Sequence, residues 1–107
     1  MGLPANVLVM NLSPDMARKM VKEIAADSSR VMLTTHAKQR MRLRKISMTQ
    51  VLCCLTNGHV VEGPARDASG NWKFNMTVIS AGEVITTTVA LDNKGAGNYA
   101  VVITVFL

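Results

Sequence analysis

The spacing of apolar positions changes near Gly58, and this change divides the sequence into two halves. Before Gly58, apolar residues recur every three or four positions, as in helices that bury one face. After it, apolar and polar residues alternate, most clearly from Trp72 to Val78, as in strands that bury one face. Helices followed by strands predict an α+β fold rather than repeated βαβ units.

The first helix is expected over about residues 14–27. Ser13 provides a side chain that can cap its first turn, and Pro14 and Asp15 are favourable within that turn. Apolar residues at helical spacing follow, at Met16, Met20, Val21 and Ile24.

Two further helices are expected before Gly58. One covers about residues 36–45, capped by Thr34 or Thr35. The other follows Ser47, which forms a capping box with Gln50. Residues 31–34 are too few for a helix and predict a short extended segment.

Four strands are expected after Gly58, at about residues 59–62, 72–78, 83–91 and 99–106. Gly63-Pro64 and residues 67–71 contain turn-forming residues between the first two strands. The last strand is almost wholly apolar, which predicts a central strand covered on both faces. The sequence therefore predicts two or three helices packed on a four-stranded antiparallel sheet.

Composition indicates one globular domain. The chain has 107 residues, of which 49% are hydrophobic, and a net charge of +5, with a pI near 9.7. A basic chain of this kind favours an anionic partner such as a nucleic acid.

Other features bear on location and cofactors. No apolar run approaches the roughly 20 residues of a membrane helix, so no membrane association is expected. Residues 1–11 lack the basic start of a signal peptide. The adjacent Cys53 and Cys54 are interpreted as reduced thiols, which predicts a cytoplasmic protein. His36 and His59 complete no metal-ligand spacing, and no cofactor is expected.

The positive charge is concentrated in the first half of the chain. Residues 35–47, THAKQRMRLRKIS, contain six basic or titratable residues and no acid. The apolar residues available to anchor this segment are Ala37, Met41, Leu43 and Ile46.

On a helix, His36, Arg40 and Arg44 fall on one face, with neighbours about 6 Å apart. Like charges at this spacing repel, whereas a phosphate accepts paired hydrogen bonds from guanidinium groups. This repulsion is the argument for an anion site. The alternative, which is more usual for a run of charges, is a solvated face, whose arginines pair after folding with acids such as Glu62, Asp67 or Glu83.

The pattern His-Ala-x-x-Arg-Met-x-x-Arg-x-Ile-Ser spans His36 to Ser47 and is followed by VVEGP, GNWKF and VVITVF. Together these motifs resemble a small bacterial family of uncharacterised domains related to RelE/ParE-like and BrnT-like toxins. The resemblance covers about residues 31–107 and leaves 1–30 as an N-terminal lead-in and helix. Lys45 stands where that family often has Gly.

The resemblance implies a RelE/barnase-like fold and a toxin that an antitoxin protein neutralises. It also implies metal-independent cleavage of RNA, including mRNA on the ribosome. For such an endoribonuclease, His36 is the candidate acid or base, because histidine titrates near neutrality. Arg40 and Arg44 would hold the scissile phosphate.

The remaining cations expected to contact RNA are Lys38, Arg42, Lys45 and Lys73. His59 is a reserve acid or base. Trp72 and Phe74 are expected in the core rather than stacked on bases. Two alternative functions remain: a non-catalytic module that binds a nucleic acid or the ribosome, and a protein-interaction domain.

Overall fold

A computed structural model of the chain describes residues 12–92 and 99–107. The lead-in before Leu12 and most of the loop expected between the last two strands lie outside these residues. The helices are α1 (Pro14–Ala25), α2 (Thr35–Arg44) and α3 (Met48–Asn57), with a 3₁₀ turn, η2 (Ser28–Arg30). The strands are β1 (Val31–Leu33), β2 (His59–Arg66), β3 (Trp72–Ser80), β4 (Glu83–Asp92) and β5 (Tyr99–Phe106).

Each helix begins at a cap that the sequence indicates. The Ser13 hydroxyl accepts a hydrogen bond from the Met16 N–H at 3.1 Å. Ser47 and Gln50 form the expected capping box at the start of α3. The three predicted helices are confirmed, with ends displaced by one or two residues.

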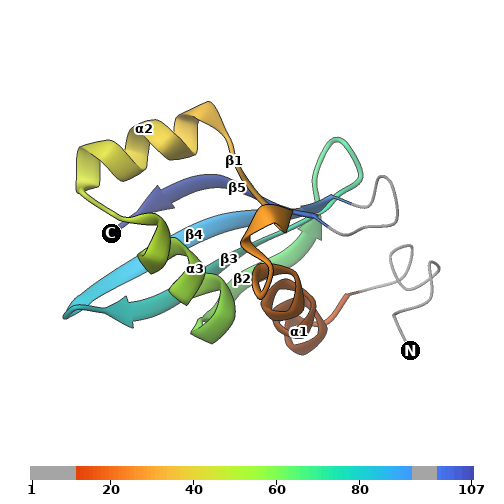
Figure 1. Cartoon of the computed structure of the whole chain (residues 1–107). Helices are drawn as coiled ribbons and strands as arrows, with labels where there is room; N and C mark the ends of the chain where they lie inside the picture. The colour runs from red at the N-terminus through yellow and green to blue at the C-terminus, as the bar shows by residue number, and fades with distance from the viewer. Residues whose placement is uncertain (1–11, 93–98) are drawn as a thin grey trace.

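The described strands form one five-stranded sheet in the order β1-β5-β4-β3-β2 (Figure 1). Strands β2 to β5 make the expected antiparallel meander. The short segment before α2 adds β1, which pairs parallel to β5 with Val31 opposite Ala100. The α+β class is confirmed, and the sheet is mixed because of β1.

Strand β2 is longer than the sequence predicts. It continues through Gly63 and Pro64, where a turn was expected, as far as Arg66. Register shifts on both sides of Glu62 let the strand bend while it stays paired with β3. Because β2 is the last strand at its side of the sheet, a proline is tolerated there.

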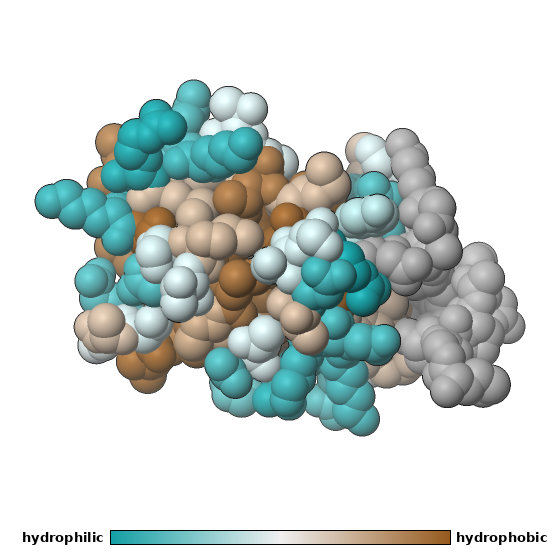
Figure 2. Space-filling model, in the orientation of Figure 1, coloured by the Kyte–Doolittle hydropathy of each residue, from teal (hydrophilic) through white to brown (hydrophobic). Residues whose placement is uncertain are grey.

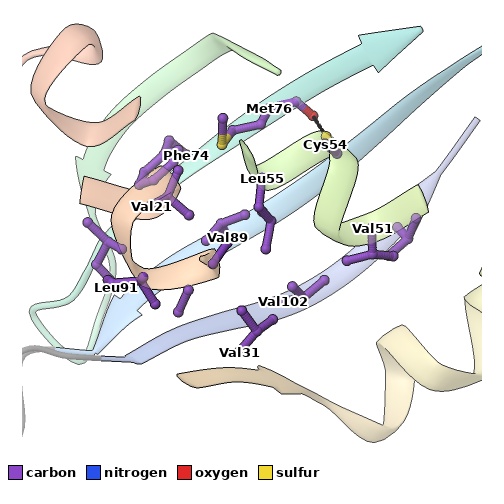
Figure 3. Close-up of a cluster of buried hydrophobic side chains, with 14 of the residues drawn as sticks. Val21, Val31, Val51, Cys54, Leu55, Phe74, Met76, Val89, Leu91 and Val102 are labelled. Carbon is purple, nitrogen blue, oxygen red and sulfur yellow. Dashed lines mark hydrogen bonds between the residues drawn. The ribbon is translucent and has the colours of Figure 1, made fainter. Parts of the chain in front are cut away.

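The core lies between one face of the sheet and the helices, with α1 and α3 in front of it in Figure 1. Figure 3 shows Leu55 of α3 and Val21 of α1 directed toward Phe74 and Val89 of the sheet. All four side chains are buried. Helix α1 therefore shares the core of the domain with α3 and the sheet.

No described helix covers the other face of the sheet. Strand β5 lies between β1 and β4, yet Val101 and Phe106 remain partly exposed while Ala100 and Val102 are buried. The prediction that this strand is covered on both faces is wrong. Its apolar composition reflects one buried face and one partly exposed face.

Candidate nucleic-acid interface

Two hydrogen bonds attach the start of α2 to the sheet, and a third caps the helix. The Thr34 hydroxyl accepts from the Ala37 N–H at 3.0 Å and donates to the Ile103 carbonyl at 2.8 Å. The Thr34 N–H donates to the Val102 carbonyl at 3.1 Å. One threonine thus caps the helix and fixes it to β5. The sequence indicates the cap, but the bond to β5 depends on the parallel pairing of β1.

Helix α2 ends at Lys45, which adopts the left-handed conformation with φ 58°. The next N–H, of Ile46, donates to the Met41 carbonyl at 2.8 Å, and the Ile46 side chain is buried. This ending turns the chain into α3. Glycine usually occupies such a position, because a Cβ atom is disfavoured there.

Between these ends, α2 buries only Ala37 and Met41. His36 and Arg44 are exposed and Arg40 is half-buried. Leu43, which the sequence suggests as an anchor, is 72% exposed. That expectation is wrong, because Leu43 lies on the opposite side of the helix from Ala37 and Met41.

Successive residues of an α-helix are about 100° apart. Gln39 therefore points directly away from the direction midway between Ala37 and Met41. Thr35 and Leu43 lie about 40° to either side of Gln39. These three exposed, uncharged residues form a line along the outside of α2, which we call the outer ridge.

Basic side chains lie on both sides of the outer ridge. His36, Arg40 and Arg44 follow one side, which we call the histidine flank, at about 60°, 100° and 140° from Gln39. Arg42 and Lys38 follow the other side, the lysine flank, at about 60° and 100°. The predicted face of His36, Arg40 and Arg44 is therefore present, but as one of two cationic flanks.

The cations of α2 make no side-chain hydrogen bond or ion pair with any residue in the described ranges. Two of the acids considered as partners bond elsewhere. Glu62 accepts from Asn75 at 2.8 Å. Asp67 accepts the N–H groups of Ser69 and Asn71. Between Asp27 and Glu62 the sequence has no acid at all. Figure 2 shows a hydrophilic surface over α2.

Lys73 does not lie beside α2. Its neighbours Trp72 and Phe74 are buried beneath the helices, so the Lys73 side chain projects from the uncovered face of the sheet. It is exposed on β3, and β4 separates that strand from β5. The structure does not bring Lys73 together with the other candidate RNA contacts.

His59 is also distant from α2. It begins β2, three strand spacings or about 14 Å across the sheet from β5, where α2 is attached. His59 is paired with Thr77 of β3. The two histidines cannot act together on one phosphodiester.

The expectation that Trp72 and Phe74 belong to the core is confirmed. The Arg66 guanidinium lies 4.5 Å from the centre of the Trp72 ring and donates to the Gly70 carbonyl at 2.7 Å. These contacts hold the β2–β3 turn, and neither aromatic ring is available for base stacking.

The Cys54 thiol is buried and donates to the Met76 carbonyl at 3.4 Å. Burial raises its pKa above the ordinary value of a cysteine, so the thiol stays protonated and weakly reactive. In the described part of the chain, no three His, Cys, Asp or Glu residues gather as metal ligands would.

Residues 33–107 match the sequence model of a family described as Domain of unknown function (DUF4258). The chain belongs to this family. The DUF4258 region begins at the end of β1, so it includes α2 and the whole antiparallel meander but leaves α1 outside. No curated protein and no solved structure matches the chain significantly. None of the helices described here is long and apolar enough to cross a membrane.

Proposed function

We propose that this chain binds RNA through α2 and cleaves it without a metal ion, as the RelE-like toxin of a toxin–antitoxin pair. The observation that carries the proposal is the set of accessible cations on α2 with no acidic partner among the described residues. The resemblance of the motif from His36 to Ser47 to toxin-related domains supports the choice of RNA.

The charge of α2 is unfavourable for the isolated helix. Cations four residues apart, such as Arg40 and Arg44, repel by a few tenths of a kcal/mol per pair. No described acid compensates this repulsion, and phosphate groups would. Arginine donates paired hydrogen bonds to phosphate, and Arg40 and Arg44 lie about 6 Å apart along the axis.

The proposed chemistry uses the histidine flank. The 2′-oxygen of a ribose attacks the adjacent phosphorus, and its proton passes to His36. The bond from phosphorus to the 5′-oxygen breaks, and that oxygen takes a proton from water; the resulting hydroxide takes the proton from His36, which returns to its neutral form. Arg40 and Arg44 stabilise the negative charge that builds up on the phosphate oxygens.

The test is cleavage of a single-stranded RNA by the purified chain in the presence of EDTA. Substitutions His36→Ala and Arg40→Ala are each expected to reduce the rate at least 100-fold, the usual scale for an acid–base or charge-stabilising group. A matched control is Lys19→Ala on the exposed side of α1. Full activity in both α2 variants would refute the proposed site.

A second candidate is a non-catalytic module that binds RNA or the ribosome. Cleavage uses one group as base and another as acid. His59 and Lys73 both lie away from α2, so neither can act as the second group beside His36, and this favours the non-catalytic candidate. This candidate predicts salt-sensitive RNA binding without cleavage products.

The proposed antitoxin partner is an acidic protein that covers α2. A short adjacent gene encoding an acidic or DNA-binding protein would support this pairing. Co-purification of the two proteins, lost when Arg40 and Arg44 are replaced by Gln, would test it. Binding unchanged by these substitutions would contradict the assignment of α2 as the contact. A plain protein-interaction role predicts a protein partner but no RNA binding.

A further inference from the structure

We propose that α2 binds inside the major groove of a nucleic-acid duplex, with one phosphate strand against each flank. This inference rests on the proposal that α2 binds nucleic acid, and it specifies the form of that nucleic acid. It starts from the two cationic flanks and the uncharged outer ridge between them.

The two flanks point in directions so different that one nucleic-acid strand cannot contact both. Arg42 of the lysine flank and His36 of the histidine flank lie about 120° apart around the helix. A single strand has one row of phosphates and would leave one flank without a partner. Two rows, one on each side of the helix, would engage the exposed Lys38 and Arg42 together with Arg40 and Arg44.

The dimensions agree with this arrangement. An α-helix with its side chains is about 10–12 Å wide. The major groove of B-form DNA is about 12 Å wide and 8.5 Å deep, so it admits one helix. The regular A-form RNA groove is too narrow. B-form DNA therefore offers a groove of suitable width, and RNA would do so only where a bulge interrupts the regular helix.

The outer ridge has the residue types that contact base edges. Glutamine can make paired hydrogen bonds to adenine, threonine can donate to several bases, and an apolar side chain can contact the methyl group of thymine. Thr35, Gln39 and Leu43 are all exposed and repeat every four residues. The ridge spans about 12 Å, the length of three to four base steps.

Helix α2 is also accessible. It lies along the β5 side of the sheet in Figure 1, and no described element lies beyond it in that view. Its inner side packs on β5 through Ala37 and Met41. This leaves the ridge directed away from the core and the flanks along the two sides of the helix, where Arg44, about 40° from the inward direction, stays exposed at the helix end.

The experiment measures binding of the intact chain to four fluorescent probes by anisotropy. The probes are a 20-base-pair DNA duplex, an RNA hairpin with a three-nucleotide bulge, an uninterrupted RNA duplex and an unstructured RNA strand. We expect the first two to bind at least tenfold more tightly than the last two. Four phosphate contacts predict that log K on DNA falls with log salt with a slope of about −3.6.

Two double variants separate the flanks, and a third is the control. Lys38→Gln/Arg42→Gln removes the charge of the lysine flank, and Arg40→Gln/Arg44→Gln removes the arginine charges of the histidine flank. Each is expected to weaken binding to the DNA duplex at least tenfold and to flatten the salt slope by about 1.8. The control Lys19→Gln/Lys22→Gln on α1 should change affinity less than twofold. Thermal unfolding confirms that each variant is folded.

The outcomes distinguish this inference from the proposed function. Equal or tighter binding to the unstructured strand, or binding that depends on one flank alone, would refute the assignment of a duplex as the ligand. The proposal that α2 binds RNA would still stand. Equal binding to the uninterrupted RNA duplex would overturn insertion in a wide groove. No binding to any probe would remove both proposals.

Discussion

At the scale of single residues, the end of α2 shows a conflict between local stability and charge. Lys45 occupies a left-handed conformation with φ 58°, which costs an L-residue with a Cβ atom about 1–2 kcal/mol. Its exposed ammonium group extends the positive charge of α2 by one position. A charged residue at a site where glycine is favoured is consistent with a contact to an anion.

Substitution Lys45→Gly is expected to raise the free energy of unfolding by about 0.5 kcal/mol. The substitution relieves backbone strain in the folded state, which stabilises it. This gain is larger than the free energy lost because glycine has more conformational entropy in the unfolded chain. The same substitution should weaken RNA binding because it removes a charge. Urea unfolding and anisotropy in the same buffer measure the two effects.

The control Lys45→Ala removes the charge but retains the Cβ atom, so it should weaken binding equally without the gain in stability. A loss of stability in Lys45→Gly would contradict the assignment of strain at this position.

At the scale of elements, α2 depends on its attachment to β5. Thr34 provides both the cap for the helix and a bond to the Ile103 carbonyl. The orientation of both flanks therefore depends on one side chain that belongs to neither.

Substitution Thr34→Val should lower the free energy of unfolding by about 1–2 kcal/mol, because it removes the cap and leaves the Ile103 carbonyl without this donor. Thr34→Ser keeps the hydroxyl and should lie within about 0.5 kcal/mol of the unchanged protein. Chemical unfolding of both variants gives the comparison. A larger loss in Thr34→Ser than in Thr34→Val would show that the methyl group, rather than the hydroxyl, stabilises the start of α2.

The elements were largely predictable because their signals are local. Ser13, Thr34 and Ser47 mark helix starts, and the alternation from Trp72 marks β3. Strand β1 was recognised only as an extended segment, because three residues have no measurable period and its partner is some 70 residues away. The continuation of β2 past Pro64 was missed because bulges depend on the partner strand.

The candidate site was predictable in part for the same reason. Helical spacing places His36, Arg40 and Arg44 on one side of α2 without knowledge of the fold. The outer ridge was missed because Leu43, an apolar residue, was counted among the anchors, whereas it is 72% exposed. Whether Lys73 lies near α2 could not be predicted, since the strand order and the sidedness of the sheet decide it.

At the scale of the whole molecule, the sheet separates the two histidines. His36 belongs to the helix attached at β5, and His59 begins β2 at the far side. The proposed chemistry therefore depends on the first histidine alone.

Substitution His59→Ala should leave the rate of RNA cleavage within about twofold of the unchanged protein, because about 14 Å of sheet separates this residue from β5. Gel assays of RNA cleavage by this variant and His36→Ala, with thermal unfolding to check the fold, make the measurement. A cleavage defect in a stably folded His59→Ala protein would place the chemistry on the β2 side of the sheet.

The parallel pairing of β1 with β5 also has a consequence for synthesis. A ribosome completes α2 some 55 residues before it begins β5, yet Thr34 finds its acceptors only on β5. A nascent chain that has not reached Tyr99 already contains every cation of α2 but lacks β5, the strand on which α2 packs. The fixed orientation of α2, on which the proposed binding of a nucleic acid depends, is thus acquired late in translation, when the last described strand enters the sheet.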